Sequence, residues 1–175
     1  MTRYRILAGL SRIETEMTSS VHPIHATAAE LNGVIEGELA SDGRPDFELP
    51  HRARFQIPIE SIRSGNRLQD AEMQRRMDAR AHPNIEVTVS KAWQLDGDER
   101  SRAKFEVEAH GRARPYEGEF TVAVEGTRVV VEGEHAFDMR DFGVDPPRFL
   151  TLKVDPEVRV RLRIEAEEDG TGGEV

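Results

Sequence analysis

The chain has 175 residues, of which 37% are hydrophobic and 33% charged, and its formal net charge is −9. This length suits one domain with a sizeable core, and the hydrophobic share is too large for a wholly disordered chain. The acidic balance argues against a nucleic-acid partner, and the lack of cysteine excludes disulfides, thiolate catalysis and cysteine-ligated metals.

The N-terminal segment contains no predicted signal peptide. Its apolar run, residues 6–10, is shorter than the core of a signal peptide, and Ser11 and Arg12 interrupt it. No window of the sequence approaches the roughly 20 apolar residues that a membrane helix needs. We therefore expect a soluble, cytoplasmic protein without a membrane span.

Alternation of apolar and polar residues is the dominant pattern of the chain. Residues 158–165 illustrate it, with four apolar and four charged side chains in strict turn. Because successive side chains of a strand point to opposite faces, such segments predict antiparallel sheet with one buried and one solvated face. The candidate strands are residues 12–18, 25–31, 33–40, 51–57, 84–95, 102–113, 116–125, 128–138 and 157–166. Turns are expected at Asn32 with Gly33, Asp42 with Gly43, Asp96 with Gly97, Arg114 with Pro115, and Gly126 with Thr127.

Residues 59–77 depart from the alternation and predict one short helix. Leu68, Met73 and Met77 are compatible with a single helical face, and Asn66 suits the N-cap position. Residues 167–175 are acidic and glycine-rich, so we expect them to form a flexible tail behind a domain of residues 1–166.

The apolar faces of these strands predict the fold. A sheet of about eight strands with one apolar face must close on itself or be covered by a second layer. Because one short helix cannot cover such a face, the sequence predicts an all-β fold: a single antiparallel eight-stranded β-barrel with one short helix at its mouth.

The inward residues are mostly small or aliphatic, which favours a hollow lumen for an apolar ligand. A barrel filled by its own side chains is an equally open alternative, and Phe55, Phe105, Phe120 and Phe137 would then plug the lumen. The candidate lumen residues are Ile35, His51, Phe55, Val87, Phe105, Val107, Phe120, Val122, Val131, His135, Phe137 and Leu162.

Residues around the helix are candidates for the barrel mouth. Arg63 can donate charge-assisted hydrogen bonds to a pyrophosphate head group, and Leu68, Met73 and Met77 offer apolar contacts. Trp93 is either an anchor on the outer face or a wall of the mouth, because a local bulge would decide its side.

Four histidines are weighed as ligands. His51 and His135 fall on inward faces, where a histidine is more often satisfied by a neighbour but can also contact the head group of a ligand. His22 and His25 have the spacing of metal ligands in a turn, but no third ligand accompanies them. We therefore expect no metal site.

Asp138, Arg140 and Asp141 offer an acid, a cation and a base within four residues. Catalysis needs such groups to converge on one substrate atom, whereas strand alternation places Asp138 and Arg140 on one face. We therefore expect an ion pair there and no enzymatic activity. Gly143, in the turn that follows, is expected to adopt a positive φ.

Several short segments carry a pattern that extends over most of the chain. Residues 59–70 read IESIRSGNRLQD and residues 77–87 read MDARAHPNIEV. Together they resemble the YceI-like family, whose pattern there is SI.SGN..RD..L, a helix, then FD...YP.I.F.S. Residues 107–111 resemble the V.G.L...G hairpin of that family, and residues 137–144 resemble its F.I.R.DFG motif. Residues 158–162 resemble its closing V.L.I strand.

The resemblance implies an extended, lipocalin-like barrel that binds a polyisoprenoid, either a quinone or a polyprenyl lipid, in its lumen. It also implies that a second copy of the chain is a possible partner, in a homodimer. The leading interpretation is therefore a non-enzymatic carrier of an apolar ligand. The alternative is a non-catalytic stress-response or protein-interaction module whose barrel is filled.

Overall fold

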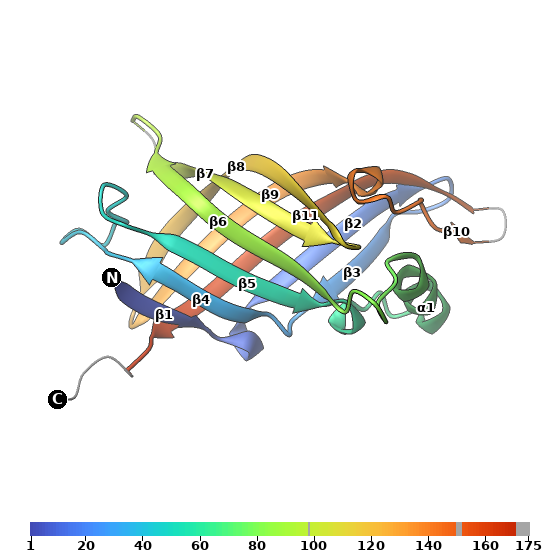
Figure 1. The fold of residues 1–175 in the computed structure, drawn as a ribbon, viewed down its shortest axis with the longest axis horizontal. Helices are drawn as coiled ribbons and strands as arrows, with labels where there is room; N and C mark the ends of the chain where they lie inside the picture. Colours follow the sequence, from blue (N-terminus) through green and yellow to red (C-terminus); the bar gives the residue numbers. More distant parts are fainter. Residues whose placement is uncertain (98, 150–151, 171–175) are drawn as a thin grey trace.

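The computed structural model describes residues 1–97, 99–149 and 152–170. Within these ranges the chain forms eleven strands, one α-helix and three short 3-10 helices (Figure 1). The strands are β1 (Thr2–Ile6), β2 (Arg12–Ser19), β3 (Ile24–Ala28), β4 (Asn32–Gly37), β5 (Arg52–Pro58), β6 (Asn84–Gln94), β7 (Arg100–Ala109), β8 (Arg112–Glu125), β9 (Arg128–Asp138), β10 (Arg148–Phe149) and β11 (Leu152–Glu168). The helices are η1 (Ala8–Leu10), η2 (Ile59–Ser61), α1 (Arg67–Arg76) and η3 (Met139–Phe142).

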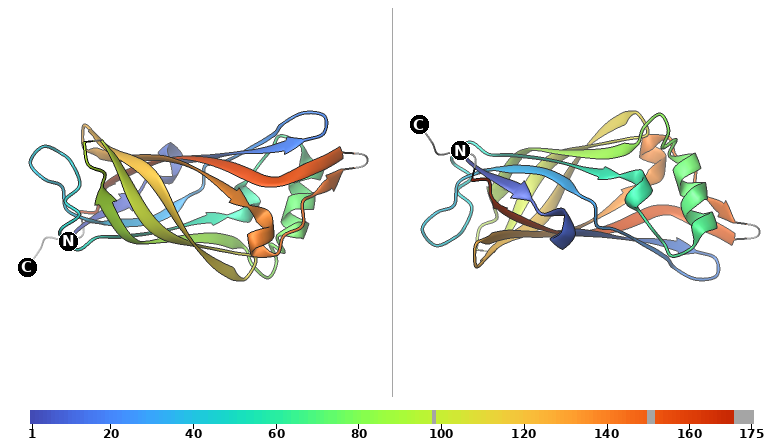
Figure 2. Two further views of the ribbon diagram at one scale, coloured as in Figure 1. Left: turned by 90° about the horizontal axis from the view of Figure 1, so that it is seen from above. Right: turned by 90° about the horizontal axis from the view of Figure 1, so that it is seen from below.

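Eight strands close into the predicted antiparallel barrel. They pair in the order β1, β4, β5, β6, β7, β8, β9 and β11, and β1 completes the ring because it pairs with both β4 and β11. β2 follows β1 along the same side of β11, and β3 pairs with β2. α1 lies across the end of the barrel opposite to β1 and the β4–β5 loop (Figures 1 and 2). The predicted lipocalin-like barrel with one helix at its mouth is confirmed.

β11 shows how the alternation shapes the wall. Arg161 and Arg163 point outward and pair with Glu134 and Glu132 of β9, at 3.8 and 2.9 Å. Leu162, between the two arginines, lines the lumen. Exposed ion pairs of this kind contribute little stability each, but they keep the outer face in water and leave the inner face to apolar side chains.

The buried core is divided into two small clusters. One gathers around Ile13, Leu31 and Ile57, and the other around Met17 and Met139 near α1 and η3. Residues of both clusters also form part of the wall of one cavity. The barrel is therefore packed where its strands and 3-10 helices meet, and it is hollow along its axis.

The β7–β8 turn lies four residues before the predicted one. His110 and Gly111 make it, with φ of +53° and +72°, and β8 continues through Arg114 and Pro115. The prediction of a turn at Arg114 and Pro115 was therefore wrong. Before Phe120, β8 pairs only with β7, so the N–H that Pro115 lacks costs no hydrogen bond toward β9.

Both ends of the chain add sheet that the sequence did not predict. β1 was missed because Thr2–Ile6 is too short for a clear alternation, although Ile6 is buried in the core. β11 continues to Glu168 by pairing with β1, so the predicted tail begins two residues too early. Residues 171–175 of that tail lie outside the described residues.

A bulge in β6 decides the side of Trp93. The register with β7 shifts between Val89 and Lys91, and Ala92 lines the lumen. Trp93 therefore lies on the outer face, where the Lys91 Nζ is 5.9 Å from the centre of its ring. Of the two alternatives, the outer-face anchor is the correct one.

Candidate ligand-binding cavity

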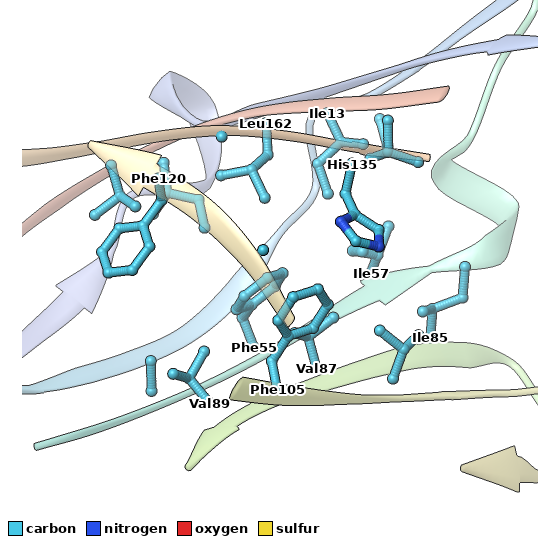
Figure 3. Close-up of a pocket in the computed structure, with 18 of the residues that line it drawn as sticks. Ile13, Phe55, Ile57, Ile85, Val87, Val89, Phe105, Phe120, His135 and Leu162 are labelled. Carbon is cyan, nitrogen blue, oxygen red and sulfur yellow. The ribbon is translucent and has the colours of Figure 1, made fainter. Parts of the chain in front are cut away.

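A cavity of about 390 Å³ occupies the lumen of the barrel (Figure 3). Every strand of the barrel contributes to its wall, as do β2 and β3. The wall is almost wholly carbon, and the volume falls within the roughly 300–1,000 Å³ of small-molecule sites. Such a cavity suits an apolar occupant.

All twelve residues that the sequence places in the lumen lie on the wall of this cavity. Phe55, Phe105, Phe120 and Phe137 are among them, so their rings border the cavity and do not fill it. The filled barrel of the alternative interpretation is therefore not what the structure shows. Direct contact of the twelve residues with a ligand stays a prediction. They are Ile35, His51, Phe55, Val87, Phe105, Val107, Phe120, Val122, Val131, His135, Phe137 and Leu162.

α1 begins at the predicted cap and turns only part of the predicted face inward. The Asn66 side chain accepts hydrogen bonds from the N–H groups of Leu68 and Gln69, at 3.0 and 3.2 Å. Met73 and Met77 line the cavity, whereas Leu68 is 81% exposed. Leu68 precedes Met73 by five residues, about 140° around a helix, so the two cannot share one face.

Arg63 also lies outside the cavity wall. Its side chain is exposed, and its backbone makes a two-hydrogen-bond bridge with Thr27 of β3, at 2.9 and 3.0 Å. The segment before α1 thus closes the free edge of β3. Of the four candidates for the mouth, Met73 and Met77 therefore line the cavity, and contact of Arg63 or Leu68 with a ligand stays a prediction.

His51 stands at one end of the lumen with both ring nitrogens engaged. The Ala92 N–H donates to His51 Nε2 at 2.9 Å, and His51 Nδ1 donates to the carbonyl oxygen of Leu49 at 2.9 Å. The first bond makes Nε2 the acceptor, so the proton is on Nδ1. The β5–β6 ladder ends at Ala53 opposite Val89. The Ala92 N–H lies beyond this end, and His51 accepts its hydrogen bond in place of a strand partner.

The β4–β5 loop adds an unpredicted aromatic residue to this end of the lumen. The expected strand 33–40 stops at Gly37, and the loop that follows carries Phe47 onto the cavity wall. Its ring makes edge contacts with His51 and Phe120, at centroid distances of 5.3 and 6.1 Å. A single aromatic side chain within a polar segment was the only signal for it.

His135 stands further along the lumen, within a group of rings. Phe105, Tyr116 and Phe137 surround it at centroid distances of 5.6, 5.6 and 4.6 Å. We call these four residues the aromatic cluster. It lies where the β8–β9 ladder ends, beyond the pair of Phe120 and Gly133, so ring contacts hold the wall there in place of backbone hydrogen bonds.

The outer side of the aromatic cluster is tied to η3. The Tyr116 hydroxyl donates to Asp141 Oδ2 at 3.1 Å. Burial, and to a lesser extent this hydrogen bond, raises the pKa of Tyr116 to about 12. Asp138 and Arg140 form the predicted ion pair, with the Arg140 Nη2 2.6 Å from Asp138 Oδ2. Gly143 ends the turn at a φ of +67°, which confirms the prediction made for it.

The remaining histidines of the sequence analysis lie outside the lumen. The His22 ring bonds to the carbonyl oxygen of Pro23, and His25 lies 3.9 Å from a carboxylate oxygen of Glu16. In the described part of the chain, no three histidine or acidic side chains gather as a metal site would require. None of the helices in these ranges is long and apolar enough to cross a membrane.

Comparison with known proteins identifies the family of this barrel. The model of the YceI-like domain matches residues 4–166. No curated protein matches the sequence.

Three solved structures with low sequence identity share the fold. BcnA of Burkholderia cenocepacia is 13% identical with a TM-score of 0.76, and the match covers 91% of this chain and 98% of that chain. A polyisoprenoid-binding domain of Saccharophagus degradans, implicated in plant cell wall breakdown, is 13% identical with a TM-score of 0.73, over 97% and 100% of the two chains. The YCEI protein of Campylobacter jejuni is 15% identical with a TM-score of 0.66, over 82% and 84%. The family match and the closed barrel agree, and this chain belongs to the YceI-like domain family.

Proposed function

We propose that the protein binds one long apolar molecule of the polyisoprenoid class inside its barrel and carries it without acting on it chemically. The cavity of about 390 Å³, with its carbon wall, is the observation that supports this proposal. Membership of the YceI-like family and the fold shared with a polyisoprenoid-binding domain support the choice of ligand class.

Burial of hydrocarbon would supply the binding free energy. Each CH₂ group removed from water contributes about 0.8 kcal/mol. Association costs on the order of 4–15 kcal/mol in lost freedom of movement. A chain of several isoprene units is therefore long enough to bind, whereas a short hydrocarbon is not.

We expect the ligand to enter beside α1. α1, which the structure describes in full, has no buried residue, although Met73 and Met77 line the cavity. At the opposite end, the Phe47 ring packs against His51, which is itself hydrogen-bonded to the backbone. The helix is thus the less firmly held of the two covers of the lumen.

A fluorescent probe tests the proposal. The purified protein is titrated with N-phenyl-1-naphthylamine, a neutral dye whose emission rises in apolar surroundings, and then with geranylgeraniol. We expect saturation at one dye per chain and displacement by geranylgeraniol but not by the same concentration of butanol. Emission that does not rise, or a dye that geranylgeraniol fails to displace, would contradict the proposal.

A further inference from the structure

The His135 imidazole is a polar group of the lumen that the fold does not use. Val160 of β11 lies opposite it on one side, and on the other side the β8–β9 ladder has already ended. Among the described residues, neither ring nitrogen has a hydrogen-bond partner. Figure 3 shows the ring extending from β9 into the cavity, with Ile57 beyond it. The half-buried ring faces the cavity, so a ligand that fills this space removes water from the ring nitrogens, and a ligand that supplies a hydrogen bond in its place gains affinity there.

The barrel leaves space for this ring at Gly118. A Cβ atom at this position would lie 3.1 Å from His135 Nδ1 and 3.3 Å from Phe105 Cε1, tighter than ordinary contact. The backbone of Gly118 does not have a positive φ. The missing side chain therefore serves to seat the two rings and does not serve a turn.

The surroundings of His135 favour its neutral form. Burial lowers the pKa of His135 below its ordinary value of 6.5. The titratable neighbour in contact with it is Tyr116, whose hydroxyl is already donated to Asp141. A neutral imidazole offers one N–H donor and one acceptor nitrogen. These two groups suit a carbonyl or hydroxyl oxygen.

An anionic head group would find no free cation on the part of the lumen wall that the structure describes. Within the described residues, Arg52 is the one cationic side chain on the cavity wall, and it forms an ion pair with Glu36. Arg63, the residue considered for a pyrophosphate, lies outside the wall. A phosphate or carboxylate inside the barrel would thus be a buried charge without a partner, which is strongly unfavourable.

We propose that His135 hydrogen-bonds a neutral oxygen of the bound chain, so that the ligand is a prenyl quinone or polyprenol and is neither a prenyl phosphate nor a plain hydrocarbon. The proposal rests on the proposed function, because it requires an apolar chain in the lumen. The apolar wall binds the hydrocarbon part of all such ligands equally well, and His135 selects those that carry a neutral oxygen.

Competition against N-phenyl-1-naphthylamine tests the assignment. The competitors are geranylgeraniol, a prenyl benzoquinone, geranylgeranyl phosphate and the hydrocarbon with the same chain as geranylgeraniol. In the wild type, we expect the alcohol and the quinone to bind about three- to tenfold more tightly than the hydrocarbon, as one hydrogen bond allows. The H135F variant should lose this preference and keep its affinity for the hydrocarbon, while H25F, altered on the exposed side of β3, should retain it.

Two further measurements address the ring itself. G118A should push His135 aside and weaken the same preference without removing an imidazole. In protein labelled with ¹⁵N-histidine, the nitrogen signals of His135 should shift on addition of geranylgeraniol and stay unchanged with the hydrocarbon.

The outcomes separate the two proposals. If all neutral competitors bind the wild type and H135F in the same ratio, or if the phosphate binds most tightly, the role of His135 is wrong and the carrier function stands. If no competitor displaces the dye from the wild type, the carrier function itself is wrong.

Discussion

Two histidines point into this barrel, each just beyond the end of a strand ladder, and they differ in what their ring nitrogens contact. At the β5–β6 ladder end, His51 bonds to the backbone through both ring nitrogens. At the β8–β9 ladder end, His135 packs against three aromatic rings, and among the described residues its ring nitrogens have no hydrogen-bond partner. The first imidazole replaces a missing strand partner, whereas the second remains available to a ligand.

This difference shows that inward position alone does not decide the role of a polar residue. Alternation places both histidines inside the barrel. The role of His51 depends on the Leu49 carbonyl in the β4–β5 loop and on the Ala92 N–H beyond the end of the ladder. Neither group can be located from the local pattern, because both depend on how segments far apart in the sequence meet.

The largest predicted effect is the loss of stability in a variant that lacks the His51 imidazole. H51F leaves the Ala92 N–H and the Leu49 carbonyl without their partner, so we expect a loss of about 1–3 kcal/mol in the free energy of unfolding. H135F removes no hydrogen bond seen among the described residues and should be neutral or slightly stabilising. Urea unfolding of both variants checks this, and equal losses for the two would break the distinction.

A smaller effect is expected where the aromatic cluster meets η3. Y116F keeps the ring contacts but removes the hydroxyl bonded to Asp141, which should cost about 0.5–1.5 kcal/mol of unfolding free energy. Thermal unfolding measures the loss. A variant as stable as the wild type would mean that this bond does not hold the cluster in place.

The smallest effect is a dependence of stability on pH. Because burial lowers the pKa of His135 in the folded state, the folded and unfolded states are both neutral at this residue well above pH 6.5. As the pH falls through about 6.5, the unfolded state takes up the proton first, so the folded state loses stability. The difference between wild type and H135F, measured by urea unfolding from pH 7.5 to 5, isolates this contribution. A difference that does not change with pH would contradict the burial of His135.

Much of the barrel could be predicted from the sequence because its strands have one wet and one dry face. β9 has the predicted bounds, and the twelve lumen residues line the cavity. The errors arose where the surroundings of a residue in the fold differ from what its local sequence pattern indicates. Pro115 reads as a turn but lies where β8 pairs on one side only, and Leu68 reads as part of an apolar face but is exposed.

The cavity could be favoured but not established from the sequence. Small inward residues are compatible with both a hollow and a filled barrel, and only the positions of the four phenylalanine rings decide between them. Phe47 was missed because loops carry no periodicity, so nothing in the pattern places their side chains.

Blocking the lumen tests the central claim most directly. Val131 lines the cavity from β9, and the adjacent Glu132 is exposed on the outer face, so V131W and E132W add the same ring inside and outside. Native mass spectrometry after incubation with geranylgeraniol should show one bound molecule on the wild type and on E132W, and at least a tenfold weaker complex on V131W. Equal binding to all three proteins, or none to the wild type, would contradict a lumen that holds the ligand.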